Sequence, residues 1–204
     1  MAQVLNIHPV NPQHRLIGQA AEIIRKGGVI VYPTDSTYAL GCHMEDKAAL
    51  DRIINIRRLD QNHLFTLVCR DLSEVSVYAR FDTPQYRILK SHTPGAFTFV
   101  LRATKEVPRR LMHPRQKTVG LRIPGHSIAH AILEELNEPM ITTTLQLPED
   151  EFPMNDIEEI LHRLKSRVDL IINGGACGTV LTTLVDLTGE MPRMLRQGKE
   201  PWMI

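Results

Sequence analysis

The sequence predicts an α/β (α+β) fold in which helices flank a twisted mixed sheet, with residues 1–204 forming a single domain. Two observations predict this class. Segments with helical spacing alternate with short strand-like segments along most of the chain. The strand-like segments outnumber the helical ones, and some follow each other without a helix between them. Because parallel pairs need long crossovers, usually helices, this order favours a mixed sheet.

The predicted helices rest on apolar spacing and on residues that begin or end a helix. Asn11 and Pro12 form a suitable N-cap and first-turn pair, and Gly27-Gly28 is a stop. The expected helices are a first one from Asn11 to Gly27, Asp46–Arg57, a third from Thr83-Pro84 that ends before Thr93, Ile128–Leu136 and Asp156–Leu164.

Strands are predicted where short apolar or alternating runs end at Pro, Gly or Asn. The expected strands are Val29–Tyr32, Leu64–Cys69, Phe97–Ala103, Val119–Ile123, Met140–Thr144, Val168–Ile172, Leu184–Leu187 and Arg193–Arg196.

The overall composition indicates a globular protein of the cytoplasm. The sequence has no apolar run long enough to span a bilayer, and its first residues lack the features of a signal peptide. Its cysteines, Cys42, Cys69 and Cys177, are odd in number and widely spaced, which is typical of reduced thiols. We therefore expect a cytoplasmic location and no membrane partner, with Cys42 a small core residue.

The distribution of charge is more informative than the net charge of +1. The segment Arg102–Arg122 is rich in Lys and Arg and contains a single acidic residue, Glu106. The segment Glu134–Glu159, in contrast, contains nine acidic residues and no Lys or Arg. A basic face of this kind can attract the phosphates of structured RNA; the alternative is a solvated loop with incidental charge. The residues of the predicted RNA-binding face are Arg102, Lys105, Arg109, Arg110, Arg115 and Lys117.

The common catalytic and metal-binding motifs are missing from the sequence. It contains no P-loop, no GxGxxG and no CxxC pair. His126, His130 and Glu134 are four apart and could in principle hold a metal, but His126 is expected to precede the helix and no fourth ligand is suggested. We therefore predict no metal site and assign no catalytic residue.

Polar residues gather where predicted strands end, which is where small ligands bind in sheet proteins. The segment Val29–Gly41, VIVYPTDSTYALG, runs from a strand into the hydroxyls of Thr34, Ser36 and Thr37, and we expect it to open the working cleft. Met140–Thr144 carries three further threonines, although strand propensity alone could explain any one of them. Arg122 lies between apolar neighbours, where a guanidinium needs an anion.

Taken together, these segments resemble the YrdC/YciO family in order and over nearly the whole chain. The matching stretches are Gly27–Cys42 (GGVIVYPTDSTYALGC), Ile56–Leu59 (IRRL), His92–Leu101 (HTPGAFTFVL), Val119–Leu133 (VGLRIPGHSIAHAIL), Glu138–Thr144 (EPMITTT), Val168–Gly175 (VDLIINGG), Thr182–Leu187 (TTLVDL) and Leu195–Gly198 (LRQG).

The resemblance implies a YrdC-like twisted sheet around a basic concave cleft that binds ATP or AMP, and an association with RNA, including double-stranded RNA. The best-understood branch makes L-threonylcarbamoyladenylate from threonine, bicarbonate and ATP with Mg²⁺, which leads to N6-threonylcarbamoyladenosine in tRNA. ATP would be a substrate, and no tightly bound cofactor is implied. Carried over by motif, the threonine-binding residues would be Thr34, Arg122 and Thr142, and the nucleotide-binding residues Arg57, Thr118, Thr144, Thr182 and Arg196.

Several family positions differ here, and the differences resemble the YciO branch. The phosphate-binding arginine falls on Leu59, the following proline is Asp60, and a Ser-Ala-Asn segment has become Thr144-Leu145-Gln146. Ala39 replaces a glycine and Val68 a histidine. Since one charge-assisted hydrogen bond contributes roughly 1.5–3 kcal/mol, we expect nucleotide binding to persist with weak turnover.

Two further readings stay open at the level of sequence. The first is a non-catalytic module that binds tRNA or ribosomal RNA through phosphates. The second is carbamoyl transfer, as in larger hydrogenase-maturation proteins that contain a related domain, although this chain lacks their additional domains. Family analogy does not decide among these readings, because function depends on the site.

Overall fold

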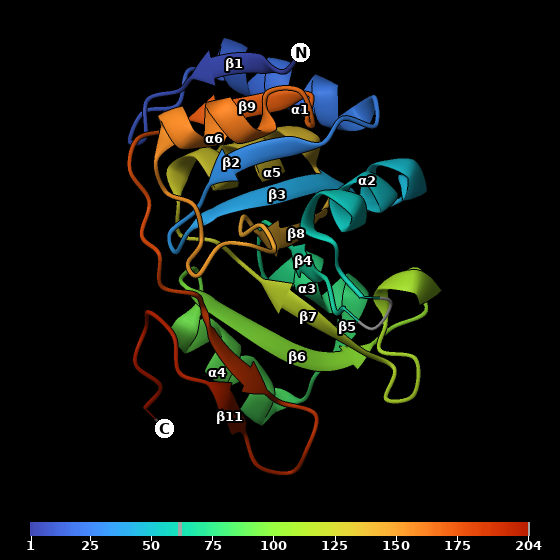
Figure 1. The fold of residues 1–204 in the computed structure, drawn as a ribbon. Helices are drawn as coiled ribbons and strands as arrows, with labels where there is room; N and C mark the ends of the chain where they lie inside the picture. Colours follow the sequence, from blue (N-terminus) through green and yellow to red (C-terminus); the bar gives the residue numbers. More distant parts are fainter. Residues whose placement is uncertain (61–62, 204) are drawn as a thin grey trace.

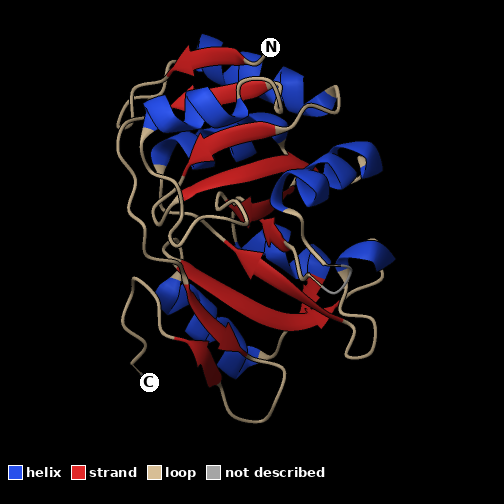
Figure 2. Cartoon of the chain, in the orientation of Figure 1, coloured by secondary structure: helices blue, strands red, loops and turns tan. Residues whose placement is uncertain are grey.

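The computed structural model describes residues 1–60 and 63–203, and within them it contains one sheet of eleven strands and six α-helices (Figures 1 and 2). Parallel pairs, such as β1 with β9 and β4 with β7, lie in the same sheet as antiparallel pairs, such as β2 with β3 and β6 with β7. The predicted mixed sheet is therefore confirmed.

The strands follow an order in the sheet that differs strongly from their order in the sequence. A two-residue strand, β5 (Ala79–Arg80), pairs with β6 outside the main path. The main path is β1 (Gln3–Asn6), β9 (Leu170–Asn173), β2 (Ile30–Pro33), β3 (Tyr38–His43), β8 (Met140–Thr144), β4 (Thr66–Val68), β7 (Thr118–Arg122), β6 (Phe97–Ala103), β10 (Thr183–Asp186) and β11 (Arg193–Arg196).

The helices divide unequally between the two faces of the sheet. On one face, α1 (His14–Arg25) and α5 (Ser127–Leu136) pack over Tyr32, Ala39 and Met140. The larger core lies on the other face, where it is covered by α2 (Lys47–Arg57), α3 (Leu72–Tyr78), α4 (Thr83–His92) and α6 (Ile157–Leu164).

This division leaves part of one face without a helix. Side chains alternate along a strand, so Thr142 shares the face of Met140, and Thr66 shares the face of Val68. Register places Gly120 beside Thr66 and Arg122 beside Val68 on that same face. Since α1 and α5 cover only the β1–β8 end of it, the remaining strands present polar side chains to an open space.

Most predicted elements form, and β6, β8, β11 and α4 have the predicted bounds. The predicted start of the first helix is wrong: α1 begins at His14, and its N-cap Gln13 makes no side-chain capping bond. His8 explains the difference, because its Nδ1 accepts the backbone N–H groups of Val10 and Asn11 at 3.2 and 3.0 Å. Asn11 therefore lies in a turn before the helix.

Five elements in the described residues have no counterpart in the prediction, namely β1, β3, α3, β5 and the 3-10 helix η1 (Arg109–Leu111). β3 is buried on both faces over most of its length, so it lacks the alternation that identifies a strand. A short helix such as α3 offers too few turns for an apolar stripe, although Asp71 caps it by accepting from the Glu74 amide at 2.8 Å.

The N-cap of α2 can be tested by its contribution to the stability of the protein. Asp46 accepts the Ala49 backbone N–H at 2.8 Å, so Asp46→Ala should lower the free energy of unfolding by about 1 kcal/mol. Asp51→Ala on the same helix is the matched control. It removes only an exposed pair with Lys47 and should change the stability by less than about 0.5 kcal/mol. Urea denaturation measures both, and equal effects would contradict the capping role.

Candidate functional site

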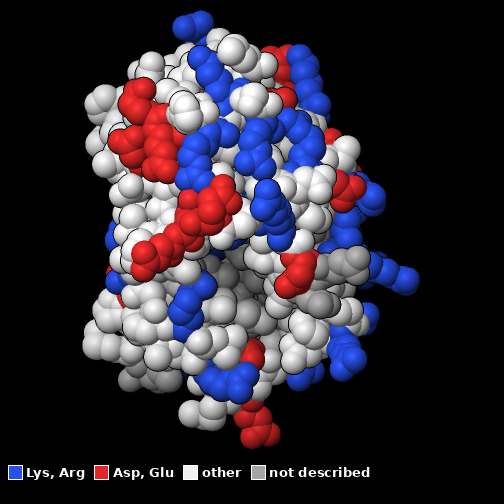
Figure 3. Space-filling view, in the orientation of Figure 1, with Lys and Arg blue, Asp and Glu red and all other residues white. Residues whose placement is uncertain are grey.

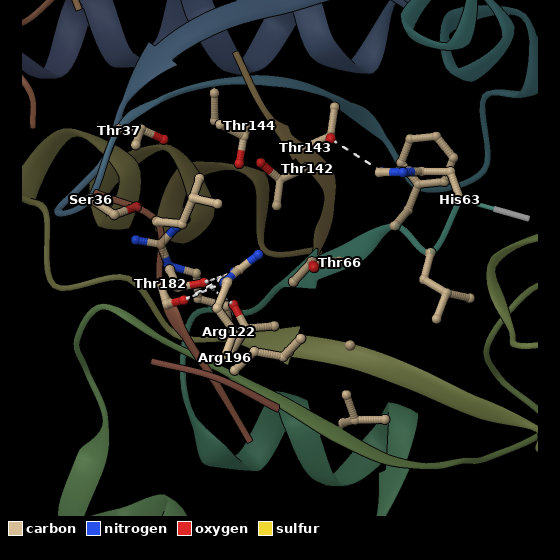
Figure 4. Close-up of a pocket in the computed structure, with 18 of the residues that line it drawn as sticks. Ser36, Thr37, His63, Thr66, Arg122, Thr142, Thr143, Thr144, Thr182 and Arg196 are labelled. Atoms are coloured by element: carbon tan, nitrogen blue, oxygen red, sulfur yellow. Dashed lines mark hydrogen bonds between the residues drawn. The ribbon is translucent and has the colours of Figure 1, made fainter. Parts of the chain in front are cut away.

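The open part of the sheet face forms a cavity of about 280 Å³, near the lower end of the range for ligand pockets (Figure 4). Strands β3, β8, β4, β7, β6, β10 and β11 all contribute to its wall, so the sheet curves around it. Figure 3 shows the corresponding hollow below the centre of the molecule. The predicted ligand residues that line the cavity are Arg57, Thr118, Arg122, Thr142, Thr144, Thr182 and Arg196.

Strand β7 forms the floor of the cavity and carries two buried polar atoms that lack partners. Thr118 Oγ1 and Arg122 Nε are buried, and neither has a hydrogen-bond partner among the described residues. Gly120 lies between them on the same face, where a Cβ would come within 3.2 Å of Thr66 Oγ1. Because buried polar groups are normally hydrogen-bonded, the two atoms indicate a place for ligand atoms along this strand.

Arg122 is oriented by a buried ion pair that the sequence analysis did not identify. Its Nη2 donates to Asp35 Oδ1, and the other carboxylate oxygen of Asp35 accepts the Gly125 backbone N–H at 2.6 Å. Burial lowers the pKa of Arg122 to about 10, so the guanidinium is still a cation at neutral pH. The pair fixes one end of the guanidinium and leaves Nε without a hydrogen-bond partner among the described residues. Asp35 lies in the PTDST run of the sequence motif Val29–Gly41. The motif alone does not indicate that Asp35 pairs with Arg122.

Thr34 lies behind the cavity wall rather than in it. Its hydroxyl donates to the Thr37 carbonyl at 2.6 Å and accepts the backbone N–H groups of Ser36 and Thr37, each at 3.2 Å. Ser36 and Thr37 line the cavity instead. The structure thus places Thr34 as the residue that closes the turn between β2 and β3. Arg122 Nη2 lies 3.4 Å from the Thr34 Oγ1 atom.

The threonines of β8 lie in the opposite wall of the cavity. Buried Tyr32 donates its hydroxyl hydrogen to Thr142 Oγ1 at 2.9 Å, and Thr142 donates to the Leu40 carbonyl at 3.3 Å. Burial raises the pKa of Tyr32, so it acts here as a neutral donor. Thr144 is half-buried in the same wall, two residues further along the strand.

Arg57 reaches the cavity from the last turn of α2. Its Nε donates to the Gln146 carbonyl at 2.7 Å and its Nη1 to Thr143 Oγ1 at 2.7 Å. Burial lowers the pKa of Arg57. Both bonded oxygens belong to neutral groups, so they hold the guanidinium in place without neutralising its charge.

His63 is a cavity residue that the sequence analysis missed. Its Nε2 lies 3.3 Å from Thr143 Oγ1, and its ring meets Phe65 edge-to-face with centroids 4.9 Å apart. Burial and then Arg57 lower the pKa of His63, while Asp60 acts in the opposite direction. A lone histidine in a polar stretch gives no motif, so only the fold reveals this position.

The C-terminal strand completes the cavity. Arg196 Nη2 donates to the Thr182 carbonyl at 3.0 Å and to Thr182 Oγ1 at 3.3 Å, and that hydroxyl lies 2.8 Å from Thr98 Oγ1. Burial lowers the pKa of Arg196. A chain of hydrogen bonds therefore connects β11 to β6 through Thr182, the residue before β10, along the side of the cavity opposite β8.

Leu59 and Gln146, two positions where the sequence departs from the expected family pattern, make contacts with the rest of this chain. Leu59 is half-buried and packs against the larger core, and it does not line the cavity. The side chain of Gln146 lines the cavity but donates to the Asp150 and Glu151 carbonyls at 3.1 and 3.2 Å. The expected second arginine of a phosphate grip is thus replaced by an apolar contact.

The predicted RNA-binding face lies outside the cavity. All six of its residues are exposed, and they come from β6 and the segment between β6 and β7, along the right-hand edge of Figure 3. Arg110 also donates to the Met44 carbonyl at 2.8 Å. Acidic side chains gather on the left of the same view, beside α6, where Arg163 pairs with Glu149, Asp150 and Glu159.

The three residues considered as metal ligands, His126, His130 and Glu134, make other contacts in the described structure. His126 is the N-cap of α5, where its Nδ1 accepts the Ile128 amide, and His130 pairs with Glu134 at 3.6 Å. In residues 1–60 and 63–203, no group of three or more His, Cys, Asp or Glu side chains is arranged to hold a metal ion. None of the helices in these ranges is long and apolar enough to cross a membrane.

Known proteins are similar to this chain in sequence and in fold. A family model for Sua5, YciO and YrdC proteins, described as telomere recombination, matches residues 22–198. The Escherichia coli K12 protein named "Uncharacterized protein YciO" is 57% identical over 198 residues, which cover 97% of this chain and 96% of that protein.

Two solved structures are similar over nearly the whole chain. The crystal structure of E. coli YciO has a TM-score of 0.93 at 56% identity and covers 97% of this chain and 96% of its own. P. abyssi Sua5 complexed with L-threonine has a TM-score of 0.88 at 25% identity and covers 97% of this chain but 58% of the Sua5 chain. These findings confirm the resemblance read from the motifs, and the chain belongs to the Sua5/YciO/YrdC family.

Proposed function

We propose that the cavity binds threonine and an adenine nucleotide and forms L-threonylcarbamoyladenylate slowly, in a role related to tRNA modification. The carrying observation is the pair of buried, unpartnered polar atoms on β7, Thr118 Oγ1 and Arg122 Nε, which belong to two residues that line one cavity. Family membership and the threonine complex of P. abyssi Sua5 support the choice of substrate class.

The amino acid is assigned to the end of the cavity near Arg122. A carboxylate is the natural partner for a buried guanidinium whose Nε is free, and the pairing is charge-assisted. Thr142 and the turn closed by Thr34 supply hydroxyls beside it. Because Asp35 already holds Nη2, the guanidinium of Arg122 is oriented before a substrate binds.

The nucleotide is assigned to the remaining cations and hydroxyls of the cavity. Arg57 and Arg196 enter from opposite sides of the sheet path, on α2 and β11, and would bracket the phosphates. Hydroxyls of Thr118, Thr144 and Thr182 would accept or donate to the nucleotide. Mg²⁺ would enter with ATP and bridge its phosphates, with few protein ligands.

The proposed chemistry asks the protein mainly to position and to neutralise charge. The amine of threonine combines with bicarbonate to give a carbamate and water. A carbamate oxygen then bonds to the α-phosphorus of ATP as the bond to the departing pyrophosphate breaks. Arg57 and Arg196 would stabilise the charge of the leaving group, while Arg122 holds the amino acid. Without an arginine at Leu59, stabilisation of the leaving group is incomplete, so turnover is slow.

A second candidate function is RNA binding by the basic face. Its supporting observation is that Arg102, Lys105, Arg109, Arg110, Arg115 and Lys117 are all exposed on one segment, outside the ligand cavity. Phosphate contacts from such a segment recognise shape and position rather than sequence. Structured RNA, such as tRNA, is the partner that this charge favours.

The proposed activity is tested by following pyrophosphate release with threonine, bicarbonate, ATP and Mg²⁺. We expect release that depends on threonine and runs at least about tenfold below a dedicated synthase, since one charge-assisted contact is missing. Omitting bicarbonate is the control for simple ATP hydrolysis. A rate equal to that of a dedicated synthase would contradict the weak turnover, and release independent of threonine would contradict the assigned reaction.

Replacing the unpartnered hydroxyl of β7 should separate stability from binding. Thr118→Val should leave the free energy of unfolding unchanged or raise it by up to about 1 kcal/mol, because it removes a buried hydroxyl without a protein partner. ATP affinity should fall roughly fivefold, since one neutral hydrogen bond is lost. Denaturation and calorimetry measure the two effects.

Thr182→Val is the matched control for this substitution. Thr182 Oγ1 is bonded to Thr98 and Arg196, so its removal should lower the free energy of unfolding by about 1–2 kcal/mol as well as weaken ATP binding. If Thr118→Val lowers the free energy of unfolding as much as Thr182→Val does, the Thr118 hydroxyl has a partner within the protein and is not free to bind a ligand.

RNA binding is tested by reversing two exposed charges of the basic face, Arg109 and Arg115. Arg109→Glu with Arg115→Glu should weaken binding to tRNA at low salt and reduce the slope of log affinity against log salt by about two. Arg110 is left intact because it holds the Met44 carbonyl. The control pair, Arg15→Glu with Arg87→Glu, lies on α1 and α4. Equal loss in both pairs, or in neither, would exclude this face as the binding surface.

A further inference from the structure

His63 and Arg57 converge on one hydroxyl in the cavity wall. Arg57 Nη1 lies 2.7 Å from Thr143 Oγ1, and His63 Nε2 lies 3.3 Å from the same oxygen, as Figure 4 shows for the His63 side. Both residues line the cavity. A guanidinium and an imidazole are thus placed side by side, although they come from α2 and from the chain between α2 and β4.

The hydrogen-bond roles in this group follow from the donor at Arg57. Since Arg57 can only donate, Thr143 Oγ1 accepts from it and keeps its own hydrogen to give to another group. The neutral imidazole can accept that hydrogen at Nε2. A protonated imidazole could not, because both of its ring nitrogens are donors. The ligand-free arrangement therefore suits a neutral His63.

The charges that face His63 agree with this assignment. Burial and the nearby Arg57 cation lower the pKa of His63, and Asp60 raises it. Phe65, the other ring in contact, carries no charge. Without a bound anion, the imidazole is thus mostly neutral at neutral pH, and negative charge brought close to it favours uptake of a proton.

We propose that His63 is a phosphate-binding residue: on nucleotide binding it becomes protonated and donates from Nε2 to a phosphate oxygen beside Arg57. This inference rests on the proposed function, since it requires a phosphate-bearing ligand in the cavity. His63 supplies the second cation that Leu59 does not supply, from a different point of the chain. Solution provides the proton that forms the new Nε2–H bond, and no other covalent bond changes.

The expected consequence is a nucleotide affinity that depends on pH in a defined direction. Binding of the anionic phosphates favours the charged imidazole, so the pKa of His63 is higher in the complex than in the free protein. Affinity is then greatest below both pKa values and falls as pH rises through the range between them. Above the higher value, the neutral ring contributes no charge to binding.

The test measures ATP affinity by calorimetry at fixed Mg²⁺ from about pH 5.5 to pH 8, the range in which histidine titrates. The wild type should lose about tenfold more affinity across this range than His63→Gln, as expected for one charge-assisted contact. The comparison cancels the titration of ATP itself. His63→Arg, which carries a permanent charge, should bind at pH 8 more tightly than the wild type.

Two controls make the outcomes separable. Exposed His162 on α6 is the matched histidine, and His162→Gln should keep the full pH dependence of the wild type. Adenosine, which has no phosphate, should bind with an affinity that His63→Gln leaves unchanged. ATP binding with the same pH dependence in the wild type and His63→Gln would overturn this inference alone. No ATP binding at any pH would overturn the proposed function and this inference with it.

Discussion

The buried pair between Arg122 and Asp35 is the interaction on which the arrangement of the cavity depends. It joins the turn between β2 and β3 to β7, two parts of the sheet path that are separated by β8 and β4. Asp35 also binds the Gly125 amide, and its backbone carbonyl accepts from Lys199 near the C-terminus. Three distant parts of the chain thus meet at one residue. Removing either partner would leave an uncompensated buried charge, which is far more costly than losing an exposed pair.

Uneven helix cover explains why a cavity lies beside this pair at all. Helices α1 and α5 bury one end of the concave face, while the remaining helices pack on the convex face. The uncovered strands carry threonines and arginines where a core face would carry apolar residues. Gly120 keeps the middle of that surface free of side chains. The same sheet therefore serves as a core at one end and as a binding surface at the other.

The sequence allowed much of this arrangement to be predicted, but by different routes. Strands β6 and β8 have clear apolar or alternating patterns, and Arg122 was noticeable as a cation among apolar neighbours. Asp35 and His63 could not be assigned, because their roles depend on partners 87 and 80 residues away. β3 was missed because it is buried on both faces and so has no period of two. Local pattern thus identifies elements, while the chemistry of the site depends on contacts between distant parts of the chain.

The position of β11 connects the site to the local stability of the fold. This strand is the last one of the sheet path, pairs only with β10 on that path, and is exposed along its whole length. Strands of this kind open at a lower free energy than central ones, so Arg196 is carried by one of the first segments to fray. A ligand that bridges Arg196 and the opposite wall would also fasten this edge to the rest of the sheet. Amide hydrogen exchange in β11 therefore reports occupancy of a cavity whose floor, β7, lies three strands further in.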